Sequence, residues 1–131
     1  MSKRLLMSVV APAAFVLAGC ASSFHDSYLV GERWNRADMH TYPVSILSVD
    51  DTDYLQRRIL VSPGMHTLRL QGPRVVGMEG EVREFRLEVE PCNTYYIVAV
   101  KPNALATDFT PKVDYTEPLG GCTPPPGWKK Q

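Results

Sequence analysis

The sequence predicts an all-β fold, a small antiparallel β-sandwich of about six to seven strands. Apolar and polar residues alternate at period two, as in residues 85–89 (FRLEV), and this pattern is typical of strands with one buried face. Clusters of Asp, Pro, Gly and Asn separate such segments and favour turns. Beyond the amino-terminal leader, no segment has a convincing helical period. These observations favour a sandwich over an α/β fold.

The predicted domain begins with an irregular stretch followed by a strand. Residues 28–40 are broken by Gly31 and predict an irregular lead-in, with Trp34 packed on the domain. Residues 44–49 (VSILSV) predict a strand, because they are rich in β-branched and apolar side chains. The acidic cluster at residues 50–53 then favours a turn.

A proline–glycine pair marks the next predicted turn. Residues 58–61 and 66–70 are predicted strands on either side of Pro63-Gly64. Proline at the second position and glycine at the third suit a type II turn, so we expect a hairpin here. Residues 61–67 align with residues 89–95 at a constant offset. We attribute this similarity to two hairpins with the same turn chemistry rather than to an internal repeat.

The second half of the domain contains a loop and two clear strands. Residues 72–81 hold three glycines and a proline and predict a mobile loop. Residues 95–100 (YYIVAV) are apolar at both parities, as expected of a central strand that is covered on both faces. Residues 109–115 alternate again, and Pro111 confines that strand to a sheet edge because it lacks a backbone donor.

The leader carries a targeting pattern. Lys3 and Arg4 precede an apolar run over residues 5–17, which ends in the tetrapeptide Leu17-Ala18-Gly19-Cys20. The run of about 13 residues is too short to span a bilayer, which needs roughly 20, but it suits the apolar region of a signal peptide. An ordinary secretory signal, or a buried helix with a chance cysteine, is the alternative explanation.

This order of residues resembles the signal peptide of bacterial lipoproteins, which ends in a lipobox. The resemblance implies a cleaved signal helix, a diacylglycerol on the sulfur of Cys20 and an acyl chain on the new amino terminus. Two or more acyl chains anchor a protein stably to a membrane. Ala21 and Ser22 follow the cysteine where Asp would favour inner-membrane retention, so the resemblance implies the outer membrane, facing the periplasm.

The expected organisation has four parts. They are a signal peptide (1–19), a lipidated tether and lead-in (20–40), the β-sandwich domain (41–122) and a proline-rich tail (123–131). Removal of the leader leaves 112 residues with 12 basic and 14 acidic side chains, a net charge of −2. Because the chain lacks a basic cluster, nucleic-acid binding is not expected.

Two cysteines remain once Cys20 is assigned to lipid. Cys92 and Cys122 lie 30 residues apart without a CxxC motif or a neighbouring histidine. In an oxidising compartment such a pair predicts a disulfide, which would stabilise the fold by about 3–4 kcal/mol through loop closure. A metal site or a redox pair is the alternative.

A second resemblance concerns the domain itself. The segments ILVSPGMHTLRL and FRLEVEPCNTYYIVAV resemble the strand, Pro-Gly, His, strand pattern of PEGA-type β-sandwich modules of bacterial surface proteins, over roughly residues 44–100. The chain lacks the PEGA tetrapeptide, and Cys92 stands where a turn glycine is usual. The resemblance implies a fold and an extracytoplasmic setting but no reaction.

Motifs for catalysis, metals and cofactors were sought, and no such site is assigned. The chain has no GxSxG, HExxH, P-loop or GxGxxG motif. His25, His40 and His66 are too widely spaced for a local metal site, and we expect His66 to hydrogen-bond a turn carbonyl. The acidic residues 50–53 resemble the start of a calcium loop, but the later glycine and glutamate of that motif are missing.

Three functional hypotheses follow. The first is a lipid-anchored, non-enzymatic structural or protein-interaction module, which presents loops or an edge strand to an envelope protein. In its proline-rich tail, Trp128 beside Lys129 and Lys130 is a candidate partner contact, for a protein groove or for an anionic lipid face. The alternative is a small-ligand or glycan-binding lipoprotein that uses residues 72–81 and exposed tyrosines. An enzyme is the third hypothesis, and it requires His66 within hydrogen-bonding reach of carboxylates.

Overall fold

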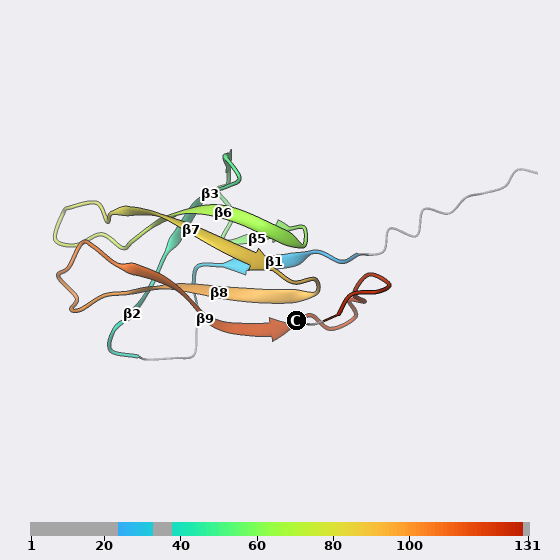
Figure 1. The fold of residues 1–131 in the computed structure, drawn as a ribbon. Helices are drawn as coiled ribbons and strands as arrows, with labels where there is room; N and C mark the ends of the chain where they lie inside the picture. Colours follow the sequence, from blue (N-terminus) through green and yellow to red (C-terminus); the bar gives the residue numbers. More distant parts are fainter. Residues whose placement is uncertain (1–23, 33–37, 130–131) are drawn as a thin grey trace, which may run out of the picture.

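The computed structural model describes residues 24–32 and 38–129. The expected signal helix, Cys20 and Trp34 lie outside these residues. The described residues form strands and no helix, so the all-β class is confirmed (Figure 1). Nine strands occur there, more than expected, because several are very short. They are β1 (Ser27–Val30), β2 (Thr41–Pro43), β3 (Ser45–Val49), β4 (Thr52–Asp53), β5 (Arg58–Val61), β6 (Gly64–Gln71), β7 (Val82–Val89), β8 (Asn93–Val100) and β9 (Thr110–Pro118).

The first sheet is built around β8. β9 pairs with β8 along its whole length on one edge, and β1 and β2 follow each other along the other edge. β5 pairs with the far side of β1. β1 runs parallel to β8, with Tyr28 opposite Thr94, whereas the other strand pairs of the described chain are antiparallel. The expected irregular lead-in is therefore wrong for residues 28–30, because they belong to β1, whose four residues are too few to show a period.

The second sheet has the order β4-β3-β6-β7. β3 and β4 form a hairpin around Asp50 and Asp51, whose φ angles of 48° and 65° are both positive, as a type I′ turn requires. The turn predicted from the acidic cluster is thus confirmed. β6 and β7 pair over eight residues, from Gly64 opposite Val89 to Gln71 opposite Val82.

The predicted hairpin at Pro63-Gly64 is wrong, because this turn joins the two sheets. β5 belongs to the first sheet and β6 to the second. Pro91-Cys92 makes the reverse crossing from β7 to β8, and positive φ values follow the proline at both corners, 130° at Gly64 and 62° at Cys92. The similarity between the two segments is therefore shared turn chemistry, as inferred, but of inter-sheet corners. Local sequence does not separate these corners from hairpins, since a proline followed by a residue with positive φ marks a turn without specifying the sheet of the next strand.

Apolar side chains from both sheets form one core. Leu29, Ile59 and Ile97 of the first sheet and Leu68 and Leu70 of the second are fully buried in the same cluster. This layering is consistent with a β-sandwich. The remaining members are Val44, Ile46, Val49, Val61, Leu87, Val89, Tyr95, Ala99 and Phe109.

Three predictions about individual strands are confirmed. Leu87 and Val89 of β7 face the core, and Phe85 packs against it partly buried. β8 is covered on both faces, since Thr94 and Val98 are buried as well as the core-facing residues between them. β9, which contains Pro111, pairs with β8 alone among the described strands.

The two ends of the domain differ. The terminal end carries residues 24–26, both inter-sheet corners and the tail over residues 119–129 (Figure 1). The loop end carries residues 38–40 and the loops 72–81 and 101–109. Backbone hydrogen bonds join these segments of the loop end, from Glu81 N to Thr107 O (3.3 Å) and from Lys101 N to His40 O (2.9 Å). The long strands β6 to β9 separate the two ends.

Candidate functional site

Cys92 and Cys122 meet at the terminal end at disulfide distance. Their Cα atoms are 5.5 Å apart and their Sγ atoms 2.03 Å apart, within the range that a disulfide requires. Cys92 belongs to the corner between β7 and β8, and Cys122 lies four residues beyond the end of β9. The positions of the two cysteines therefore match the pairing that was predicted from their number. The pair ties the tail to the corner of the domain.

The beginning of the described chain is held at the same place. Cys92 N donates to His25 O (3.2 Å), and Leu119 N donates to Cys92 O (2.8 Å). Nδ1–H of His25 donates to Thr123 O at 2.6 Å. The Sγ atom of Cys122 also lies 3.2 Å from the carbonyl oxygen of Phe24. The segment before β1 and the tail after β9 are thus bound to each other and to the corner.

Ser27 secures this junction from inside the domain. Its side chain is fully buried, and its hydroxyl donates to Glu90 O (2.5 Å) and accepts from Asn93 N (3.0 Å). A buried hydroxyl with both roles satisfied links β1 firmly to the corner. The sequence did not suggest this role, because Ser27 stands in a short polar segment that was interpreted as tether.

Trp128 lies at the terminal end, where the tail ends in a turn. Its backbone N donates to Pro125 O (3.1 Å), and its residue surface is 42% exposed. Phe24 (45% exposed) and Met65 (54%) are further exposed large apolar residues at this end. Lys129 is also exposed. The candidate partner contact is therefore close in the fold to the start of the described chain.

The loop over residues 72–81 contains a small hairpin. Val75 and Met78 exchange backbone hydrogen bonds of 3.0 and 2.9 Å, and Arg74 and Glu79 form an ion pair beside them. The hydrogen bond from the guanidinium lowers the pKa of Glu79. Val76 and Met78 expose their side chains at the tip, and Leu105 is exposed on the neighbouring loop. The loop end thus presents apolar tips on an ordered turn.

The tyrosine pair on β8 and β9 lies away from this loop. Tyr96 and Tyr115 face each other across β8 and β9, with ring centroids 6.1 Å apart. They lie on the outer face of the first sheet, since Tyr95 and Ile97 on either side point into the core. The loop connects β6 and β7 of the second sheet. The structure therefore does not bring together the two elements that the glycan-binding hypothesis combines.

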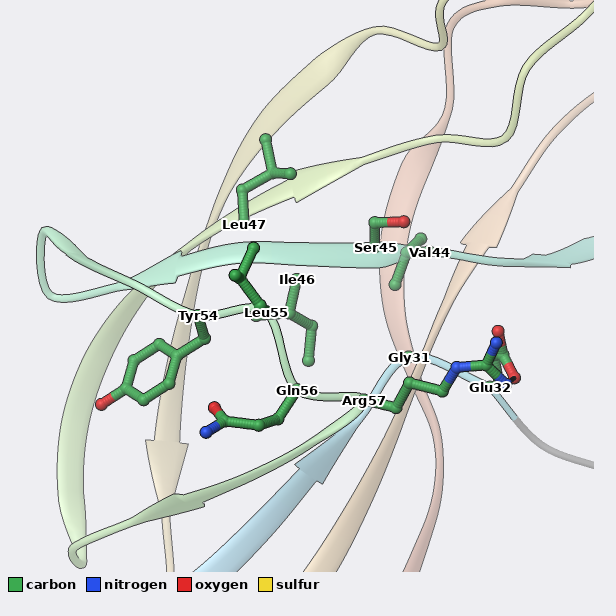
Figure 2. Close-up of a pocket in the computed structure, with 10 residues that line it drawn as sticks. All are labelled: Gly31, Glu32, Val44, Ser45, Ile46, Leu47, Tyr54, Leu55, Gln56 and Arg57. Carbon is green, nitrogen blue, oxygen red and sulfur yellow. Dashed lines mark ion pairs between the residues drawn. The ribbon is translucent and has the colours of Figure 1, made fainter.

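A groove of about 370 Å³ lies between β3 and the linker from β4 to β5 (Figure 2). Residues 44–47 and 54–57 line its two sides, with Gly31 and Glu32 at the end of β1. Figure 2 shows Arg57 beside Glu32 at one side, where Nη1 lies 3.8 Å from Oε2. Tyr54 is the single aromatic residue among the lining residues. This groove lacks the stacked aromatic surface that a sugar site needs.

His66 lies within reach of a carboxylate, as the enzyme hypothesis requires. Its Nδ1 is 2.5 Å from Oδ2 of Asp50. Its Nε2, however, donates to Ser62 O at 2.6 Å, which confirms the expected bond to a turn carbonyl. Because a carbonyl only accepts, Nε2 carries a proton and has no lone pair to offer a substrate. The imidazole joins the corner to the β3–β4 turn and is not available as a general base.

Asp50 completes this cluster through its backbone and its carboxylate. Thr67 N donates to Oδ1 (2.9 Å), and Asp50 N donates to Thr67 O (2.9 Å). The backbone hydrogen bond from Thr67 and the side-chain bond to His66 lower the pKa of Asp50. The arrangement acts as a clip between β3 and β6.

Other kinds of site were sought in residues 24–32 and 38–129. Within them, three or more His, Cys, Asp or Glu side chains nowhere gather as a metal ion would require. A helix with the length and apolarity to cross a membrane is not present among these residues either. No protein-family model, no curated protein and no solved structure matches the chain. The leader pattern and the contrast between the two ends of the domain are therefore the features that bear on function.

Proposed function

We propose that the chain is a lipid-anchored bacterial envelope protein whose sandwich domain is a non-enzymatic structural or interaction module facing the periplasm. The observation that carries this proposal is the position of the two ends of the described chain, Phe24 and the tail. Phe24, four residues after Cys20, lies at the terminal end together with the tail, while the ordered loops lie at the opposite end. A lipid on Cys20 would therefore direct the loop end away from the membrane.

Two further features support the setting. Cys92 and Cys122 lie at disulfide distance, and such bonds persist in oxidising compartments such as the periplasm. The resemblance to lipoprotein signal peptides and to PEGA-type surface modules points to the same place. Ala21 and Ser22 after the cysteine favour the outer membrane.

The loop end is better suited to a protein partner than the long edge strands β7 and β9 are. The edge strand β9 has Pro111 as its second residue and Pro118 as its last. The edge strand β7 exposes alternating charges, among them Arg83, Glu84 and Arg86. Prolines and charges on an edge oppose the addition of another strand. The exposed apolar tips of the loops are not protected in this way.

The test combines acylation with crosslinking in living cells. The full chain is produced in a Gram-negative host with a clickable fatty acid, with Cys20→Ser as the control, and its amino-terminal fragment is weighed. A photo-crosslinking amino acid replaces Val76 or Leu105 at the loop end, and Met65 at the terminal end as the matched control. We expect acylated Cys20 and protein adducts from the loop-end sites alone. An unacylated precursor in the cytosol, or no adducts from either loop site, would refute the proposal.

A further inference from the structure

The terminal end gathers exposed apolar side chains from three separate segments. Phe24 precedes β1, Met65 lies near the start of β6, and Trp128 stands in the tail. Each exposes between 42% and 54% of its surface. The contacts of His25 with Thr123 and of Cys122 with Phe24 hold the segment before β1 against the tail. The start of β6 is held by its pairing with the end of β7, where Gly64 lies opposite Val89. The apolar side chains therefore occupy fixed positions at one end of the domain.

The length of chain before Phe24 limits where this end can lie. Four residues separate it from Cys20, and an extended chain spans at most about 3.5 Å per residue. A lipid on Cys20 would hold the terminal end within about 14 Å of the bilayer surface. Exposed aromatic residues at that distance reach the headgroup region, where Trp is enriched because its ring is amphipathic. This step rests on the proposed function.

The charges at this end favour apolar over electrostatic contact. His25 and Lys129 lie there together with Asp26 and Glu90, so the two signs are mixed. Attraction to anionic lipids needs a cluster of basic residues, which the described part of this end does not offer. Partial insertion of apolar side chains does not depend on lipid charge.

We infer that the terminal end is a membrane-contacting face, on which Phe24, Met65 and Trp128 rest in the interfacial region of the bilayer that holds the lipid anchor. The occupant of this face is the lipid surface itself. Trp128 then orients the domain on the membrane rather than recognising a protein. The loop end is directed into the periplasm as a consequence.

The test measures the depth of Trp128 in the acylated full chain. The protein carries Trp34→Phe, so that Trp128 is its single indole, and is reconstituted into phosphatidylcholine vesicles with and without brominated acyl chains. The matched control adds Trp128→Phe and Leu105→Trp, which moves the indole to the loop end. We expect blue-shifted, bromine-quenched emission from Trp128 and several-fold weaker quenching from the loop-end indole. Trp34→Tyr serves as a second background if Trp34→Phe does not fold.

The outcomes separate this inference from the lipoprotein proposal. The mass of the amino-terminal fragment of the same sample shows whether Cys20 is acylated. A fragment without the lipid would refute the proposed function. Unquenched Trp128 in an acylated sample, or equal quenching at the two ends, would refute the membrane face alone. Quenching of Trp128 that persists in high salt and without anionic lipid supports apolar contact with the bilayer. Loss of this quenching in high salt would overturn the inference of apolar contact.

Discussion

Backbone conformation at single residues marks the turns of this domain. Within the described chain, the non-glycine residues with positive φ are Asp50, Asp51, Val76 and Cys92. Asp tolerates this region because its short side chain bonds locally, whereas a β-branched residue is strained there. Val76, with φ of 43°, is therefore the least suited residue for its position.

Replacement of Val76 by Asn should stabilise the domain. The side chain is 84% exposed, so little packing is lost, and relief of the strained backbone is worth about 1 kcal/mol. Urea unfolding should show a higher midpoint for Val76→Asn than for the parent. Val82→Asn, on the exposed face of β7, is the matched control and should not stabilise. An unchanged midpoint for Val76→Asn would contradict the assignment of strain.

Asp50 should make stability depend on acid pH. Its pKa is lower in the folded state than the ordinary value of 3.8, first because of the bond from Thr67 N and then because of His66. The unfolded state therefore binds the proton more readily, and stability rises with pH through this window. The contribution is complete above the unfolded pKa and is lost as pH falls through the lower folded pKa.

Asp50→Asn should flatten that acid dependence. Asn keeps an acceptor for Thr67 N and tolerates the φ of 48°, but it does not titrate. Urea unfolding is measured from neutral pH to well below the ordinary carboxyl pKa. Asp51→Asn, in the same turn, corrects for the change in net charge. An acid slope equal to that of the parent protein would show that Asp50 makes no such contribution.

At this scale the sequence predicted only part of the site. The turn at Asp50 and the carbonyl bond of His66 followed from turn chemistry. The roles of Ser27 and of Asp50 as partner of His66 depend on residues far apart in the chain, brought together by the sheets. A pattern over neighbouring residues carries no signal for such contacts.

At the scale of elements, the long strands were predictable and the short ones were not. Alternation over five or more residues indicated β7 and β9, and apolarity at both parities indicated β8. β1, β2 and β4 contain four, three and two residues, too few to show a period. β1 also pairs with strands that are distant in sequence, β5 and β8. The corners at Pro63-Gly64 and Pro91-Cys92 were mistaken for hairpins, because turn residues specify a change of direction but not the sheet of the next strand.

Gly31 should be intolerant of any side chain. Gly31 directly follows β1, and its carbonyl accepts a hydrogen bond from Val44 N (2.9 Å), just before β3. A Cβ atom added at Gly31 would lie 2.0 Å from Val44 O. Gly31→Ala should therefore cost about 2 kcal/mol or more, since backbone must move. Gly120→Ala is the matched control, because its Cβ would meet no atom within 4 Å. Thermal unfolding should separate the two variants, and equal midpoints would contradict the close approach.

At the scale of the whole molecule, the cysteine pair joins the tail to the corner between β7 and β8. The number of cysteines predicted the Cys92–Cys122 pair. The leader pattern predicted a location in the bacterial envelope. The grouping of Phe24, Met65 and Trp128 at one end was not predictable, because it requires the order of strands in both sheets. The separation of terminal and loop ends likewise appears only with the topology.

Reduction of the pair should weaken the fold substantially. The bond closes a loop of 30 residues, and its loss should lower the free energy of unfolding by about 3–4 kcal/mol. Urea unfolding with and without a phosphine reductant measures this difference. Mass spectrometry of unreduced periplasmic material counts the thiols. Free thiols at both Cys92 and Cys122 would contradict the pairing.

In the lipoprotein that we propose, the position of β1 beside β8 constrains the order in which the domain is completed during export. β1 emerges first from a secretion channel, yet its partners are β5 and β8, with Tyr28 opposite Thr94. The first sheet therefore stays open until most of the polypeptide has been translocated. Pairings between such distant residues also form slowly. Periplasmic chaperones would meet the proposed lipoprotein as a nearly complete but unfinished chain, already held at the bilayer by its lipid anchor.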